Sequence, residues 1–181
     1  MTSIRLVDSE SLSATEVGSI RELLWDAFAD DEDGRFEEYD WQHALGGVHV
    51  VLEDDGVILA HAAVVERILE IDGRAVRTGY LEAVATRPGH EGRGHGSAVV
   101  GAASAIVLEG YELGALGTGR FAFYERLGWE RWRGASSVRT EDGPVSTPDD
   151  DGWIMVLRTP SSGELSLDAA ISCAWRPGDV W

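Results

Sequence analysis

Lysine is missing from this chain: all 15 of its basic residues are Arg. P-loop ATPases and pyridoxal phosphate enzymes each need a specific lysine, so the sequence excludes both classes. Cysteine is nearly absent as well, because Cys173 is the only one in the sequence. A single Cys excludes an intrachain disulfide framework, and its apolar-leaning neighbours predict a buried structural thiol, not a nucleophile.

Long hydrophobic runs are lacking too. The longest apolar stretch, residues 98–108, is interrupted by Gly101 and Ser104. It falls short of the ~20 residues that span a bilayer. The first ten residues have neither the basic start nor the apolar centre of a secretory signal. We therefore expect a cytoplasmic protein with no membrane partner.

Positive charge is scarce relative to negative charge, and the formal net charge is -17. Such a charge repels the nucleic-acid backbone, so we expect no nucleic-acid partner and favour a cationic ligand. Surplus acid also aids solubility, and charge alone leaves that alternative open. The length of 181 residues and the 44% hydrophobic content suit one core. We expect residues 1–181 to form a single domain.

Hydrophobic periodicity predicts a mixed α/β fold. Apolar residues recur at helical spacing over residues 14–29, which indicates an amphipathic helix. Two β-rich runs, 48–52 and 57–68, are separated by acidic turn residues and predict a hairpin, and Asp72-Gly73 predicts a second tight turn. The remaining pattern predicts strands over 3–7, 77–86, 113–116, 129–132 and 153–158, and helices over 97–109 and 120–127.

Three segments are expected to be irregular loops: 30–40, 140–152 and 160–163. The first contains DDEDG, which resembles part of a calcium-binding loop. Aligning that pattern on Gly34 puts Ala29 at the first ligand position, where a carboxylate is required. We therefore reject calcium binding there.

A glycine-rich loop, RPGHEGRGHG over residues 87–96, places Gly92, Gly94 and Gly96 directly before a predicted helix. Such glycines let backbone N–H groups approach a pyrophosphate at the positive end of the helix. The spacing is not the dinucleotide-binding fingerprint, and no ribose-binding acid follows. Spacing alone leaves a surface turn and an anion site equally open.

The strand before this loop, 79–86, and the loop itself resemble the central strand and acetyl-CoA loop of the GNAT acetyltransferases. Downstream, residues 121–129 resemble their final helix and turn, in which a tyrosine precedes a Gly-Phe or Gly-Trp pair. The resemblance implies the GNAT fold, with a central, mostly antiparallel sheet flanked by helices. It also implies acetyl-CoA as cosubstrate and coenzyme A as product. The coenzyme-binding residues it implies are Val84, Ala85, Thr86, Glu91, Gly92, Arg93, Gly94, His95 and Gly96.

Glu91 departs from the family pattern, which has Arg or Gln at this place in the loop. A carboxylate beside phosphates is unfavourable. We expect either that the Glu91 side chain turns to solvent or that the pyrophosphate relies on backbone amides and on Arg87 or Arg93.

Other segments are similar to the aminoglycoside 2′-N-acetyltransferases: Asp40-Trp41, Leu45-Gly46-Gly47, residues 147–152 and the terminal WRPGDVW of residues 175–181. The terminal stretch is the most specific of these. The similarity implies a polycationic aminoglycoside substrate and a homodimer. It implies an acceptor site made of Asp40, Glu82, Ala83, Gly117, Thr118, Asp150, Asp179 and the Trp181 α-carboxylate. Taken alone, Asp40 favours helix capping, and Asp149–Asp151 favour a solvated turn.

The same resemblance implies direct acetyl transfer without a covalent enzyme intermediate. Glu82 would remove a proton from the amine, usually through water, with the Trp181 carboxylate as a competing base. The Val84 N–H would stabilise the oxyanion, and Tyr124 would protonate the departing thiolate. Without the resemblance, Glu82 is open to interpretation as a buried acid paired with Arg, and Tyr124 as an aromatic that packs its helix onto the sheet.

The five histidines, His43, His49, His61, His90 and His95, show no zinc-ligand spacing. We expect no metal and interpret them as surface or packing residues. Ala83 stands where relatives have glycine, and Gly117-Thr118-Gly119 stands where they have a serine-rich segment, so drug preference stays open.

Two other functions remain. One is acetylation of another amine, such as an amino sugar of the cell envelope. The other is a catalytically inactive fold that binds acetyl-CoA or cations, against which the retention of Glu82 and Tyr124 argues.

Overall fold

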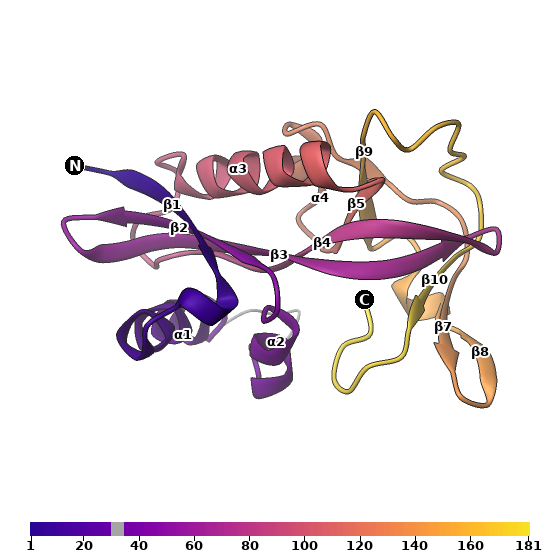
Figure 1. The fold of residues 1–181 in the computed structure, drawn as a ribbon, viewed down its shortest axis with the longest axis horizontal. Coiled ribbons are helices and arrows are strands. Elements are labelled where there is room, and N and C mark those ends of the chain that lie inside the picture. The colour runs from indigo at the N-terminus through magenta and orange to yellow at the C-terminus, as the bar shows by residue number, and fades with distance from the viewer. Residues whose placement is uncertain (30–34) are drawn as a thin grey trace. The chain divides into compact units, whose positions relative to one another are not determined.

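The computed structural model describes residues 1–29 and 35–181 (Figure 1). The chain divides into two compact units. Unit 1 comprises Met1–Val65 and Leu81–Ala105, and unit 2 comprises Glu66–Tyr80 and Ile106–Trp181. Strands β3 (Val57–Ile71) and β4 (Arg74–Thr86) are each divided between the two units. The acidic segment for which calcium was rejected, residues 30–34, lies outside the described residues. The single-domain expectation stays a prediction.

Unit 1 contains an antiparallel arrangement of β1 (Ser3–Asp8), β2 (Val48–Asp54) and the first part of β3. These strands lie side by side in Figure 1. Asp55 and Gly56 connect β2 to β3 with φ of 48° and 80°. Positive φ at both central residues is the geometry of a type I′ turn, whose twist matches the flanking strands. The hairpin predicted over these residues is confirmed.

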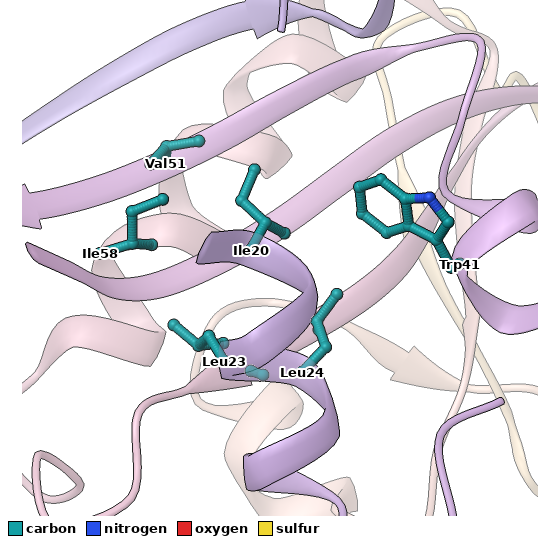
Figure 2. Packing of buried hydrophobic residues seen from close by; sticks show 7 residues of the cluster. Ile20, Leu23, Leu24, Trp41, Val51 and Ile58 are labelled. Carbon is teal, nitrogen blue, oxygen red and sulfur yellow. The ribbon is translucent and has the colours of Figure 1, made fainter. Parts of the chain in front are cut away.

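Helix α1 (Ala14–Ala27) supplies the apolar face that covers this part of the sheet. It begins with a capping box: the Glu16 N–H donates to Ser13 Oγ over 3.2 Å, and the Ser13 N–H donates to the Glu16 carboxylate over 2.9 Å. Figure 2 shows the packed side chains. The buried cluster consists of Ile20, Leu23, Leu24, Trp41, Val51, Ile58 and Ala85. Each large member contributes roughly 1.5–3 kcal/mol by leaving water.

Helix α2 (Glu38–His43) corrects the expectation that residues 30–40 form only a loop. The Glu37 N–H donates to Asp40 Oδ2 over 2.7 Å, which satisfies a backbone donor at the start of the helix. Trp41 is buried in the α1 cluster. Burial of this one tryptophan against distant residues stabilises a helix too short to show a periodic pattern in sequence.

Helix α3 (His95–Gly110) follows the glycine-rich loop and begins two residues before the predicted start. Its buried side chains, Val99, Val100, Ala103 and Val107, recur at three- and four-residue spacing. That spacing places them on one face of the helix. No helix among residues 1–29 and 35–181 is long and apolar enough to cross a membrane.

The strands of unit 2 follow the order β6-β9-β5-β4-β3-β10-β7-β8. Of β4 and β3, only residues 74–80 and 66–71 belong to this unit. The other strands are β5 (Leu113–Gly117), β6 (Glu130–Arg131), β7 (Ser136–Thr140), β8 (Gly143–Ser146), β9 (Ile154–Arg158) and β10 (Ile171–Ala174). The β4–β5 and β10–β7 pairs are parallel, whereas β5–β9, β6–β9, β7–β8 and β10–β3 are antiparallel. The expected mixed α/β fold with a mostly antiparallel sheet is confirmed.

The second half of the chain also departs from expectation. Residues 140–152 were expected to be irregular, yet they contain β8 and the 3₁₀ helix η2 (Pro148–Asp150). Strands β7 and β10 were not predicted. They pair in parallel across more than thirty residues of sequence, with Ile171 opposite Ser136. The β7–β10 pairing leaves no local pattern in the sequence, because the two strands are remote from each other along the chain.

Strand β10 places Cys173 in the interior with 0% of its surface exposed. Its thiol donates to the Val180 carbonyl oxygen over 3.2 Å, and burial raises the pKa of the thiol. The prediction of a buried structural thiol is confirmed.

Candidate active site

The second part of β4, in unit 1, contains a backbone irregularity at Ala83. Its φ is +51°, a left-handed value inside a strand. This conformation costs an L-residue other than glycine roughly 1–2 kcal/mol. A left-handed residue within a strand bends the backbone locally, as the first residue of a G1 β-bulge does, and redirects the groups next to it. We refer to this bend at Ala83 as the bulge. The bulge therefore lies between Glu82 and Val84, two of the predicted site residues.

Two buried histidines of the hairpin reach this bulge. His61 in β3 lies with Nδ1 2.7 Å from the Ala83 carbonyl oxygen. Its Nε2 lies 2.9 Å from Nδ1 of His49 in β2, and Nε2 of His49 lies 2.8 Å from Ser9 Oγ. Both rings are 0% exposed. Burial lowers the pKa of His49 to about 4 and that of His61 to about 3, so both are neutral at pH 7.

Sequence reasoning missed this pair, which it interpreted as surface or packing side chains. The signal was present: each histidine interrupts an apolar strand run, VHVVL over 48–52 and LAHAAV over 59–64. A polar side chain in a buried strand needs a hydrogen-bond partner, and two such chains in adjacent strands can partner each other. The contact of His61 with the Ala83 carbonyl could not be predicted, because the two residues are 22 positions apart in sequence.

The glycine-rich loop enters α3 through Gly92 and Gly94, whose φ values are 71° and 85°. Only glycine adopts such values without strain. The Ala98 N–H donates to the Gly94 carbonyl over 2.9 Å, so the helix ladder starts at the end of the loop. The amides of the first turn, at His95 and Gly96, therefore belong to a helix N-terminus, which favours anions.

The charged residues of the glycine-rich loop differ in their exposure and in their contacts. Glu91 is exposed, which agrees with the expectation that its side chain turns to solvent. Arg87 is tied down, since its Nε donates to the Ile58 carbonyl over 2.8 Å. Arg93 is exposed and donates to the Gly89 carbonyl over 3.2 Å. His90 Nδ1 is buried without a hydrogen-bond partner among the described residues.

Asp40 and Glu82 complete the acidic candidates of unit 1. Asp40 accepts the Glu37 N–H, which is the local capping role that the sequence alone favoured. Glu82 is half-buried on β4 next to the bulge. Beyond the bulge, Ala85 turns its side chain into the α1 cluster, so that only its backbone is available to a ligand.

In unit 2, Tyr124 lies on α4 (Phe121–Glu125) and is 6% exposed. Its ring packs edge-on against Trp129, with centroids 6.1 Å apart, so the packing interpretation holds. Burial raises the pKa of its hydroxyl well above the ordinary value, and Arg120 opposes that rise. The hydroxyl therefore keeps its proton at working pH, as a general acid must.

The last residues of the chain are held in unit 2 by several contacts. The Trp181 indole N–H donates to Thr147 Oγ1 over 3.1 Å, and its backbone N–H donates to Asp179 Oδ1 over 3.3 Å. Arg67 Nη2 donates to the Val180 carbonyl over 2.8 Å. Gly117 faces the end of the chain so closely that an added Cβ would lie 3.3 Å from the Trp181 carbonyl carbon.

Asp150 lies within electrostatic range of this tail. Loss of solvent raises the pKa of its half-buried carboxyl, and the carboxylate of Asp179 raises it further. Thr118 connects to the same segment, since its N–H donates to the Trp153 carbonyl over 2.9 Å, and the Trp153 N–H donates to the Asp150 carbonyl over 3.0 Å. Unit 2 thus brings together five predicted site residues: Gly117, Thr118, Asp150, Asp179 and Trp181.

The predicted site residues therefore fall into two groups. Asp40 and all predicted residues from Glu82 to Gly96 belong to unit 1, and those from Gly117 onward belong to unit 2. Within residues 1–29 and 35–181, no three His, Cys, Asp or Glu side chains are grouped so as to hold a metal ion.

A family model described as an acetyltransferase (GNAT) domain matches residues 9–132, more than half of the chain. The chain belongs to the GNAT superfamily of acetyltransferases. It is 40% identical over 181 residues to an aminoglycoside 2′-N-acetyltransferase of Mycolicibacterium fortuitum, covering 98% of this chain and 91% of that protein. The resemblance noted in the sequence is confirmed.

Solved structures of GNAT proteins share the fold at low sequence identity. A GNAT family N-acetyltransferase of Escherichia coli, solved with CoA, superposes with a TM-score of 0.66 at 18% identity, covering 95% of this chain and 89% of that one. A GNAT family acetyltransferase of Brucella melitensis, solved with acetyl-CoA, gives a TM-score of 0.63 at 17% identity, with 97% of each chain covered.

Proposed function

We propose that this GNAT acetyltransferase transfers the acetyl group of acetyl-CoA to the 2′-amino group of aminoglycosides. The observation that carries the proposal is the 40% identity, over 98% of the chain, to an aminoglycoside 2′-N-acetyltransferase. A net charge of -17 and the grouped carboxylates of Asp150 and Asp179 support a polycationic acceptor. Ammonium groups are best held by carboxylates, which attract their charge and accept their hydrogen bonds.

Acetyl-CoA is the acyl donor in this proposal, and the residues of unit 1 fit its pyrophosphate. Gly92 and Gly94 adopt positive φ directly before α3, a helix of 16 residues whose N-terminus attracts anions. Arg93 adds an exposed cation. The backbone of β4 beyond the bulge and the first turn of α3 would supply the other contacts: Val84, Ala85, Thr86, Glu91, His95 and Gly96.

The reaction is a direct transfer. The bound ammonium first loses a proton, because only a neutral amine can attack a carbonyl carbon. The amine nitrogen then forms a bond to the acetyl carbon, the carbon–sulfur bond breaks, and the nitrogen loses its second proton. One of the two protons ends on the coenzyme sulfur and the other goes to solvent, so the products are an amide and free coenzyme A.

Two groups are candidates for the base. Glu82 lies next to the bulge on β4 and would act through an ordered water. The Trp181 α-carboxylate is the competing candidate, and it belongs to the acidic group of unit 2 together with Asp179. Either group could take the first proton from the ammonium. The pH profiles of Glu82→Gln and of a variant extended beyond Trp181 distinguish them, because the variant that has lost the base also loses the acidic limb of the rate profile.

The transition state needs two further groups. The Val84 N–H would donate to the oxygen that becomes negative as the amine attacks, an interaction worth most in a site that excludes water. The Tyr124 hydroxyl would give its proton to the thiolate as it leaves. A tyrosine hydroxyl has an ordinary pKa of about 10, so it carries the proton at neutral pH that this role requires.

A matched pair of drugs tests the proposal. We expect coenzyme A release and a mass gain of one acetyl group with an aminoglycoside that carries an amine at C2′, and neither with one that carries a hydroxyl there. A panel of other primary amines, including amino sugars, forms the third arm. Turnover on those amines with none on the 2′-amino drug would reject the proposal.

A second test concerns the end of the chain. A short peptide appended after Trp181 would displace or mask its carboxylate, so we expect the acceptor KM to rise while the KM of acetyl-CoA stays constant. The same peptide appended before Met1 is the control. An unchanged acceptor KM would remove the Trp181 carboxylate from the acceptor site.

The proposal describes a cytoplasmic homodimer with no nucleic-acid or membrane partner. The homodimer rests on the resemblance to aminoglycoside 2′-N-acetyltransferases, and light scattering on the purified protein tests it. A mass of 19.6 kDa instead of twice that value would show a monomer.

A further inference from the structure

We infer that His61, held in place by His49 and Ser9, is a positioning residue that fixes the oxyanion donor of the proposed acetyl transfer. The inference rests on the proposed function for the reaction that it serves. Its geometry rests on contacts within unit 1 alone: His61 to the Ala83 carbonyl, His49 to His61, and Ser9 to His49.

Ser9, His49 and His61 form a hydrogen-bonded relay that ends on the Ala83 carbonyl oxygen. The proton positions in this relay follow from that carbonyl. A carbonyl oxygen only accepts, so His61 Nδ1 must carry a proton and donate to Ala83 over 2.7 Å. A neutral imidazole has one ring proton, so Nε2 of His61 is an acceptor, and His49 Nδ1 donates to it over 2.9 Å. His49 Nε2 then accepts the Ser9 hydroxyl proton over 2.8 Å.

This ordering holds only while both rings are neutral. A proton on His61 Nε2 would face the N–H of His49 Nδ1, which leaves a donor opposite a donor. Both rings are fully buried, and desolvation is the leading cause that lowers both pKa values. Trp41 packs beside His49, with ring centroids 5.9 Å apart. The relay is therefore neutral and has one tautomeric state.

The far end of the relay is anchored by the Gly46-Gly47 segment. The N–H groups of Gly46 and Gly47 donate to Ser9 Oγ over 2.9 and 3.2 Å, which leaves the hydroxyl proton for His49 Nε2. Gly47 cannot be replaced here, because an added Cβ would clash with the Val64 carbonyl oxygen. A part of the sequence that the reaction itself does not use thus fixes the position of Ser9.

The near end of the relay acts on the proposed oxyanion donor through one peptide unit. The Ala83 carbonyl and the Val84 N–H belong to the same peptide, and in a planar trans peptide they point in opposite directions. Holding the Ala83 oxygen therefore sets the direction of the Val84 N–H. Donation to the carbonyl also polarises the amide and makes its N–H a stronger donor.

The bulge needs such a restraint. Ala83 is left-handed, a conformation that costs an alanine roughly 1–2 kcal/mol. The bond from a buried, neutral donor offsets part of that cost. The relay does not conduct protons, because it ends on a carbonyl oxygen that cannot pass one on. Its contribution is a donor that is oriented before the reaction, which is how oxyanion sites accelerate acyl transfer.

Replacing His61 by Phe removes the donor and keeps a ring in the cavity, whereas His61→Asn keeps an N–H near the position of Nδ1. We expect His61→Phe to lower kcat by roughly 10- to 100-fold, below the loss expected when an oxyanion donor is deleted outright, with both KM values changed less than about threefold. We expect His61→Asn to recover most of that loss. Unchanged kcat in His61→Phe, or equal losses in both variants, would overturn the inference.

A destabilising variant outside the relay separates positioning from general loss of structure. Leu23→Ala truncates a fully buried apolar side chain of α1 that forms no hydrogen bond with the relay, and should cost roughly 2–5 kcal/mol of stability. We expect its kcat to stay near that of the wild type at a temperature where it is folded. An equal fall of kcat in Leu23→Ala and His61→Phe would assign the effect to stability and overturn the inference.

Nitrogen-15 NMR of the ligand-free protein reads the geometry independently of any acceptor. We expect both His49 and His61 to be neutral and protonated on Nδ1 at pH 7, and the Val84 amide proton to shift in His61→Phe. A proton on Nε2 of His61, or an unmoved Val84 amide, would overturn the inference. If the wild type acetylates no aminoglycoside, the proposed function fails, while these spectra still decide whether the relay exists.

Discussion

The two units of this acetyltransferase prepare their candidate residues in different ways. In unit 1 the groups proposed to bind a ligand are mainly backbone: the loop before α3 and the peptide after Ala83, which a buried neutral histidine holds. In unit 2 the proposed groups include the carboxylates of Asp150 and Asp179, which interact electrostatically. A ligand defined by its shape and phosphates suits the first arrangement, and one defined by positive charge suits the second.

This difference has consequences that experiments can separate. Backbone amides and buried histidines depend on geometry and are little affected by salt, because their partners are fixed and desolvated. Partly exposed carboxylates act over longer distances and are screened by salt, with a Debye length of about 8 Å at physiological ionic strength. Changes in unit 1 should therefore appear in kcat and stability, and changes to the carboxylates of unit 2 in the acceptor KM.

Tyr124 is an exception to this pattern, because it lies in unit 2 and yet should affect kcat. Its replacement has the largest expected effect. We expect Tyr124→Phe to lower kcat by roughly 10²–10⁴-fold, the range for a lost general acid, with little change in the KM of acetyl-CoA. Steady-state kinetics measure this. Tyr111→Phe is the matched control, since Tyr111 is also partly buried in unit 2 and belongs to no proposed catalytic contact. Equal rates in Tyr124→Phe and the wild type would remove Tyr124 from the mechanism.

Acid should destabilise unit 1 through its histidines. Their unfolded pKa is about 6.5, whereas burial lowers the pKa of His49 to about 4 and that of His61 to about 3 in the folded chain. Below pH 6.5 the unfolded state binds protons that the folded state does not, so stability falls as pH falls, and the loss ends below the folded pKa values. We expect each histidine to account for about 2 kcal/mol of loss between pH 7 and 5.

Urea unfolding of the wild type and of His49→Gln at pH 7 and 5 measures this slope. Glu16, whose pKa is lowered to about 2 by Ser13 and Arg5, is the same in both proteins, so its contribution cancels in the comparison. Identical slopes in the two proteins would mean that His49 is not the buried neutral group described above.

Local signals in the sequence were sufficient for much of unit 1. The hairpin turn at Asp55-Gly56 and the loop before α3 are specified by residues adjacent in sequence, and both are where the pattern predicted them. The relay was missed because its members, Ser9, His49 and His61, come from separate elements and meet only through the pairing of β1, β2 and β3. Ring tautomers also leave no trace in a sequence.

Unit 2 was harder to predict. Strands β7 and β10 are short, and their pairing with each other joins segments more than thirty residues apart in sequence. The grouping of Asp150 with Asp179 was expected only from the resemblance to known enzymes, because an acidic turn ordinarily indicates a solvated loop. The Asp150 carboxyl is half-buried, which raises its pKa, and composition alone cannot reveal that burial.

Single-charge variants test whether the carboxylates of unit 2 bind the acceptor. We expect Asp150→Asn and Asp179→Asn each to raise the acceptor KM about tenfold, since a hydrogen bond to a charged group contributes roughly 1.5–3 kcal/mol. The KM of acetyl-CoA should stay constant, and the effect should shrink at high salt. Asp149→Asn is the matched control, an exposed acid in the same turn. If Asp149→Asn raises the acceptor KM as much, net charge and not position explains the effect.

The smallest effect concerns the bulge itself. Ala83→Gly should stabilise the chain by about 0.5–1 kcal/mol, because glycine adopts a φ of +51° without strain, which outweighs its greater freedom in the unfolded state. Ala85→Gly, two residues further along β4, is the control and should destabilise by a similar amount, since its backbone is not left-handed. Urea midpoints of the two variants should therefore move in opposite directions. A fall of both midpoints would mean that the hydrogen bond from His61 already removes the strain at Ala83.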